Sequence, residues 1–92
     1  PNHPNPFNPT TTIRYDLPEP SYVSLVIYDI LGREVRRLLD SRVDAGFKSV
    51  VWDGRDDTGN SVSTGIYIYM LRVWSQESDK TYQKTEKMVF LR

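Results

Sequence analysis

The sequence predicts an all-β sandwich, and two features of the chain carry this prediction. First, most of the chain falls into about six or seven runs of about five to ten residues in which apolar and polar side chains alternate, as they do along half-buried strands. Second, clusters of glycine, proline, asparagine and aspartate separate these runs at spacings of about eight to twelve residues. The length of 92 residues fits a single domain.

The N-terminal segment is rich in proline. Four of the six prolines lie within residues 1–9, and each of them lacks a backbone N–H and biases the preceding residue away from the helical region. We therefore expect residues 1–9 to form a lead-in linker without regular structure, packed on one sandwich domain formed by residues 10–92. Phe7 is the one large apolar side chain of the lead-in, so we expect this segment to pin the first strand through Pro4, Asn5, Pro6 and Phe7.

Alternation predicts two strands in the first half of the domain, over residues 10–17 and 22–29. The next segment, 33–40, is ambiguous, because its leucines and its valine fit a helical stripe as well as a short strand. The remaining elements are a strand over 47–52, a polar loop over 53–60, a short edge piece over 61–64, and two long strands over 65–74 and 81–92 that are expected to form a hairpin.

Composition limits the classes of function. Lysine plus arginine equals aspartate plus glutamate, so the formal net charge is zero and nothing predicts attraction to nucleic acid or to an anionic membrane. The chain contains no cysteine, and no apolar run approaches the roughly 20 residues of a membrane helix. The only histidine, His3, lies in the lead-in without a second histidine to share a metal. We therefore expect no enzyme activity, no catalytic residue and no cofactor.

The polar loop over 53–60 is the candidate metal site. Asp53, Asp56 and Asp57 supply the oxygen ligands that calcium prefers, but Arg55 stands at an alternating position where the calcium-loop pattern needs an oxygen. The other interpretation is a capped turn, in which the carboxylates accept backbone N–H bonds and the glycines adopt positive φ. The spacing favours the turn over the metal site.

The strand over 65–74 has two apolar faces, with Tyr67 on one and Ile68 on the other. Either a loop or the lead-in covers the second face, or it is an exposed patch that docks a partner. The basic cluster of Arg33, Arg36 and Arg37 is interpreted as a solvated strand face rather than a site for an acidic partner, since the net charge is zero.

The last strand ends KMVFLR, with a basic residue on each side of four apolar residues. One interpretation is a structural strand whose flanking charges protect it from edge-to-edge pairing. The other is a recognition element that a receptor reads by strand addition. The two interpretations are compatible.

Four motifs occur in a specific order: PNPFNP at 4–9, YDILGREV at 28–35, GIY at 65–67 and KMVFLR at 87–92. In this order they resemble the C-terminal sorting domain, type A, of the type IX secretion system. The chain is also similar to the immunoglobulin-like domain of flagellar hook-capping proteins, above all at WDGRDDTGN (52–60) and again at GIY. The resemblance covers nearly the whole chain.

The resemblance implies an immunoglobulin-like antiparallel β-sandwich of seven strands, and it makes residues 33–40 a strand. It implies a sorting signal that follows a secreted cargo and directs it through the periplasm and across the outer membrane, for release or cell-surface attachment. The implied partners are the outer-membrane secretion machinery and a surface sortase. The residues implied in recognition are Gly65, Tyr67, Lys87, Met88, Val89, Phe90, Leu91 and Arg92.

A non-catalytic structural or adhesive module is the alternative to a sorting domain. This class includes a hook-cap-like domain, a spacer and a carbohydrate-binding domain of an extracellular protein. Sugar binding needs exposed aromatic side chains, for which Trp74 and Tyr22 are the candidates, whereas Trp52 is expected in the core.

Overall fold

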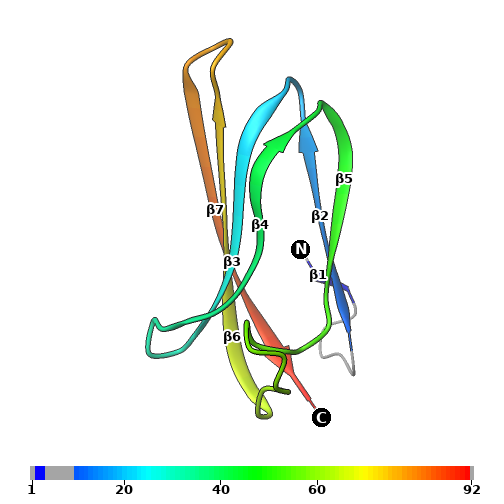
Figure 1. Ribbon diagram of the computed structural model, residues 1–92, viewed down its shortest axis with the longest axis vertical. Helices are drawn as coiled ribbons and strands as arrows, with labels where there is room; N and C mark the ends of the chain where they lie inside the picture. The colour runs from blue at the N-terminus through cyan, green and yellow to red at the C-terminus, as the bar shows by residue number, and fades with distance from the viewer. Residues whose placement is uncertain (1, 4–9, 92) are drawn as a thin grey trace.

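A computed structural model describes residues 2–3 and 10–91, which form two antiparallel sheets facing each other (Figure 1). The described strands are β1 (Asn2–His3), β2 (Thr11–Leu17), β3 (Ser21–Asp29), β4 (Glu34–Val43), β5 (Gly46–Trp52), β6 (Gly65–Ser75) and β7 (Lys80–Phe90). One sheet has the order β1-β2-β5 and the other the order β4-β3-β6-β7. The predicted all-β sandwich is confirmed.

The core lies between the two sheets and follows from the alternation of the strands. The inward side chains of β3, which are Val23, Leu25 and Ile27, are fully buried, and Trp52 at the end of β5 is fully buried opposite them. Residues of β2, β6 and β7 complete one cluster. The buried apolar residues of this cluster are Ile13, Leu17, Val23, Leu25, Ile27, Trp52, Val62, Tyr67, Tyr69, Leu71, Met88 and Phe90.

The ambiguous segment over 33–40 is a strand, as the family resemblance implied. All of it except Arg33 lies within β4, which pairs with β3 along residues 34–43. The register of this pairing shifts beside Leu25/Val26 and Ile27/Tyr28 of β3. Val35, Leu38 and Leu39 are partly buried against the core, so the leucine pair serves a bulged strand and not a helical stripe.

Two expectations are wrong. The lead-in was expected to lack regular structure, but Asn2 and His3 form β1, which pairs antiparallel with Ile13 and Thr12 of β2. These two residues keep their backbone N–H groups, and His3 precedes a proline, which favours the extended conformation that a strand needs. The short edge piece over 61–64 is not a strand, because only Ser61 makes an isolated bridge, to Arg55.

One outer edge of the larger sheet is closed by the polar loop. The backbone N–H of Asp57 donates to the carbonyl of Val35 in β4 at 3.0 Å, and its carboxylate accepts the N–H of Arg37 at 3.0 Å. At the opposite end of the strand order stands β7, which pairs with β6. Within residues 2–3 and 10–91 no helix is long and apolar enough to cross a membrane.

Candidate functional site

The two C-terminal recognition motifs meet in the hairpin of β6 and β7. Gly65 is paired with Phe90 and Tyr67 with Met88, so the start of β6 lies beside the end of β7. Figure 1 shows this end of the hairpin next to the C-terminus. The sequence-predicted recognition residues that the structure describes therefore form one contiguous site.

Half of this site belongs to the core. Tyr67, Met88 and Phe90 are buried, and the rings of Tyr67 and Phe90 pack on Trp52 with centroid distances of 5.5 and 5.7 Å. The Tyr67 hydroxyl donates to the carbonyl of Ser63 at 2.7 Å, and burial raises the pKa of this phenol. These three side chains hold the strands together and are not accessible to a partner while the domain is folded.

The other half faces outward. Lys87 is exposed, Val89 is half-buried, and Leu91, just beyond the strand, is 43% exposed. Beside them on β6, Ile66 pairs with Val89 and Ile68 with Lys87. We call Ile66, Ile68, Lys87, Val89 and Leu91 the terminal face.

The terminal face includes two residues that the sequence-based site did not contain, Ile66 and Ile68. The signal for them was the second apolar face of the strand over 65–74. That face was expected either to be covered by a loop or the lead-in or to be an exposed patch. Ile66 is exposed, so none of the described loops covers the face at this position. Arg92 and the anchor residues Pro4, Asn5, Pro6 and Phe7 lie outside the described residues, so the anchor stays a prediction.

The polar loop is a set of capped turns, as its spacing favoured. The Asp56 carboxylate accepts the N–H groups of Thr58 and Asn60, each at 3.0 Å, and the Thr58 hydroxyl at 2.7 Å. These hydrogen bonds, the Thr58 hydroxyl first, lower the pKa of Asp56 below its ordinary value of 3.8. Gly54 and Gly59 have positive φ, as expected of such turns.

The other two aspartates of the loop face arginine. Asp53 accepts a hydrogen bond from the Arg36 guanidinium at 3.1 Å, and Asp57 lies 3.9 Å from the same group. Among the described residues no group of three or more acidic or histidine side chains is placed to hold a metal ion. Asp53 and Asp57 therefore connect the loop to β4, whereas Asp56 orders the loop itself.

The basic cluster is satisfied within the chain. Arg33 pairs with Asp29 at 2.8 Å and Arg37 pairs with Glu34 at 2.8 Å, while Arg36 holds the polar loop. The expected solvated strand face is thus a row of internal ion pairs, which leaves little free positive charge for an acidic partner.

The two aromatic candidates for sugar binding lie side by side. Tyr22 of β3 is directly opposite Trp74 of β6, and each is 42% exposed on the outer face of the larger sheet. The Tyr22 hydroxyl donates to Asp40, and the Trp74 indole donates to Asp79 at 3.3 Å. Trp52 is in the core, as expected.

Solved structures with this fold fall into two groups. The first contains FlgD proteins. FlgD from P. aeruginosa is 30% identical, with a TM-score of 0.68, and the match covers 87% of this chain and 60% of that one. FlgD from Helicobacter pylori is 18% identical, with a TM-score of 0.62, and the match covers 98% of this chain and 65% of that one. The chain thus spans less than two thirds of the FlgD chains that it matches.

The second group comes from Porphyromonas gingivalis. Dimeric latent PorU is 23% identical, with a TM-score of 0.78, over 99% of this chain and 9% of PorU. PorZ, described as an essential bacterial surface component of the type IX secretion system, is 24% identical, with a TM-score of 0.57, over 100% of this chain and 11% of PorZ. At these identities the likeness shows a shared fold.

The sequence comparison decides the family. No curated protein matches the chain. The sequence profile described as the FlgD Ig-like domain matches residues 7–77, which is most of the chain. Together with the FlgD structures, this match confirms the immunoglobulin-like sandwich that the resemblance implied. The chain belongs to the FlgD Ig-like domain family.

Proposed function

We propose that this domain is a sorting signal that directs a cargo protein across the outer membrane through the type IX secretion system. The observation that carries the proposal is the alternation of the last strand. Its even-numbered residues Met88 and Phe90 are locked in the core, while its odd-numbered neighbours belong to the terminal face. A receptor can therefore read the strand without unfolding the domain.

The terminal face suits reversible recognition by another protein. It combines exposed and half-buried aliphatic side chains with the exposed charge of Lys87, a composition found where apolar contact supplies affinity and a charge supplies orientation. Its aliphatic side chains lie on two paired strands, β6 and β7, so a partner would meet them as one surface. The shared fold with PorU and PorZ supports the proposal.

In this proposal the domain binds and does not catalyse. Its partners are the outer-membrane machinery, a surface sortase and the cargo that precedes the lead-in in the same chain. The protein passes through the periplasm and ends outside the cell or on its surface. No cofactor takes part.

A matched pair of variants tests the proposal on residues 1–92 fused behind a periplasmic passenger, in a host with the type IX machinery. Val89→Asp with Leu91→Asp places two charges on the terminal face and is expected to leave the passenger in the periplasm. Gln83→Asp with Thr85→Asp places the same charges farther along the outer side of β7 and is expected to leave export unchanged. Equal export of both fusions, with unchanged melting temperatures, would refute the role of the terminal face.

A carbohydrate-binding module is the second candidate, because Tyr22 and Trp74 stand opposite each other with half-exposed rings and carboxylates beside them. Adjacent aromatic rings are a platform for the apolar faces of sugar rings, and the carboxylates can accept hydroxyl donors. Isothermal titration with soluble polysaccharides tests it. Binding that is lost in Trp74→Ala and kept in Tyr82→Ala, an exposed aromatic elsewhere, favours this candidate, and the absence of binding heat eliminates it for the sugars used.

A further inference from the structure

The outer face of the smaller sheet carries large exposed apolar side chains. The pairing of β2 with β5 places one row of each strand on this face, while the opposite rows hold the buried Ile13, Leu17 and Trp52. On the outer row of β5, Phe47 is 91% exposed and Val51 is 56% exposed. Among the described residues Phe47 is the most exposed large apolar side chain, so its ring contributes contact area to a surface and not to the core.

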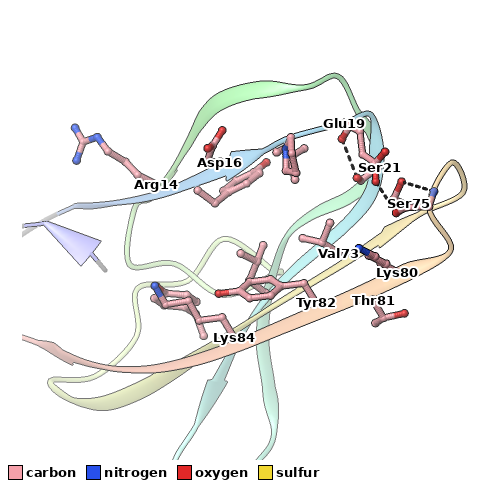
Figure 2. A pocket seen from close by; sticks show the side chains of 16 residues that line it. Arg14, Asp16, Glu19, Ser21, Val73, Ser75, Lys80, Thr81, Tyr82 and Lys84 are labelled. Atoms are coloured by element: carbon pink, nitrogen blue, oxygen red, sulfur yellow. Dashed lines mark hydrogen bonds between the residues drawn. The ribbon is translucent and has the colours of Figure 1, made fainter.

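Two opposite charges lie beside Phe47 on the outer row of β2. Asp16 is paired with Phe47 across the strands, and Arg14 is paired with Ser49. Figure 2 shows both charged side chains projecting from β2 on the side away from β7. Both are exposed, and none of the ion pairs that the described residues form involves either of them. This face therefore presents one positive and one negative charge, about 7 Å apart along one strand.

The pattern of charge and size on this face is self-complementary. A two-fold axis that lies between two such faces and crosses the strands midway between Arg14 and Asp16 sets Arg14 of each copy opposite Asp16 of the other. The same rotation sets Phe47 of each copy opposite Ser49 of the other, so a large side chain meets a small one. A two-fold axis parallel to the strands would instead set Asp16 against Phe47, which buries a carboxylate without a partner.

We propose that two copies of this chain associate through the outer face of β2 and β5, about the two-fold axis that crosses the strands. One rotation matches both charge and size, and this favours a second copy over an unrelated partner. The two strands have seven residues each, so the contact lies at the small end of specific interfaces, and we expect a dissociation constant of about 0.1 mM. The proposal concerns the other sheet from the terminal face and does not depend on the sorting role.

Sedimentation equilibrium of the 92-residue chain, from about 20 µM to about 1 mM, measures the association. We expect a monomer–dimer equilibrium that is at least about tenfold weaker in Phe47→Ala, because aromatic side chains at the centre of an interface carry much of its affinity. NMR shifts that depend on protein concentration are expected at the outward residues of 12–16 and 47–51. Thermal melts of the parent and of every variant establish that each one is folded.

Charge reversal provides the matched test. Arg14→Asp and Asp16→Arg are each expected to weaken self-association by about tenfold, since each turns both intermolecular pairs into pairs of like charge. An equimolar mixture of the two variants should form a heterodimer within about threefold of the parent affinity, because both of its pairs are attractive again. The double variant, whose net charge equals that of the parent, should also dimerise. Arg72→Asp, on the exposed outer side of β6, is the control and should leave the affinity within about twofold.

Four results would each overturn the proposal: a chain that stays monomeric at about 1 mM, concentration-dependent shifts on another face, equal weakening by Arg14→Asp and Arg72→Asp, and a mixture of the two reversed variants that stays monomeric. A further outcome assigns the face to a different occupant. If the chain is monomeric and the ring signals of Phe47 shift when a passenger is fused before it, then the passenger covers this face and the second copy is refuted.

Discussion

Tyr69 lies at the centre of the larger sheet with 1% of its surface exposed, on the inward row of β6. Burial, with smaller contributions from Glu86 and Tyr82, raises its pKa from 10.0 to about 12. The protonated phenol is therefore favoured by the fold. Its contribution to stability is fully present below pH 10 and is lost as the pH rises from 10 toward 12.

The substitution Tyr69→Phe should consequently protect the domain from alkali. The difference in unfolding free energy between variant and parent is expected to move in favour of the variant by up to about 3 kcal/mol between pH 9 and pH 12, from the size of the pKa shift. Urea titrations at fixed pH measure it. Tyr28→Phe, which removes a hydroxyl from the outer face of the same sheet, is the control, and identical pH profiles for the two variants would contradict the assignment.

Gly65 belongs to a predicted recognition motif, but its backbone conformation does not require glycine. A Cβ placed on it would meet Tyr67 Cε2 at 3.9 Å and the Ser63 carbonyl at 4.0 Å, which are ordinary contacts, and its φ is not in the left-handed region. We expect Gly65→Ala to keep or raise stability, by up to about 1 kcal/mol, because glycine costs conformational entropy in a strand. A lower melting temperature would contradict this. Loss of export by the stable variant would place the need for glycine in recognition.

At the scale of elements, the turns are organised by carboxylates. In the β3–β4 hairpin Asp29 accepts the N–H groups of Leu31 and Arg33, at 2.9 and 3.0 Å, and in the polar loop Asp56 plays the same part. Both pKa values are lowered, that of Asp29 chiefly by the Arg33 N–H and that of Asp56 chiefly by the Thr58 hydroxyl. The ionised caps add stability above the ordinary pKa of 3.8, and this stability is lost as the pH falls below it.

Asp56→Asn should therefore lower the melting temperature at pH 7 and flatten its fall below pH 4, since the amide does not titrate. Thermal melts from pH 7 to pH 2.5 measure both effects. Asp44→Asn, at an exposed position in the turn between β4 and β5, is the matched control and should follow the parent. An acid limb as steep in Asp56→Asn as in the parent would mean that Asp56 does not contribute.

The elements that could be predicted from sequence are those where alternation and turn chemistry agree. The inward row of β3 and the capped polar loop are of this kind. The misses arise where tertiary pairing decides. Asn2–His3 become a strand only because β2 offers a free edge, and Val26, on the outer row of β3, is 3% exposed although alternation gives it a solvent face. For the candidate site, the motifs identified the right strands, but only the pairing of β6 with β7 separates core from surface within them.

At the scale of the whole molecule, β7 has three surfaces. The inward residues near its end, Met88 and Phe90, close the core. The inward residues near its start, Tyr82 and Lys84, border a hollow between β2 and β7, and its outward row belongs in part to the terminal face. A single strand thus connects folding to the proposed contact, and binding at the terminal face would leave the core unchanged.

The division of β7 predicts opposite consequences for adjacent residues. Phe90→Ala removes a buried ring from the cluster with Trp52 and Tyr67, and should cost about 3–5 kcal/mol of unfolding free energy. Small domains have total unfolding free energies of only about 5–15 kcal/mol. For a parent at the lower end of this range, we expect the variant to melt near or below 37 °C. Leu91→Ala, at a 43% exposed position, should change the unfolding free energy by less than about 1 kcal/mol.

Leu91, whose replacement has little effect on stability, is expected to matter directly for export. With the passenger fusion, Leu91→Ala should reduce surface delivery although the domain stays folded, because it removes an aliphatic side chain from the terminal face. Phe90→Leu, which keeps an apolar side chain in the core, should retain more stability than Phe90→Ala and more export than Leu91→Ala. If export instead follows unfolding free energy across all three variants, then the machinery senses the folded state of the domain and not its terminal face, and the buried pairing of β6 with β7 becomes the whole contribution of these motifs.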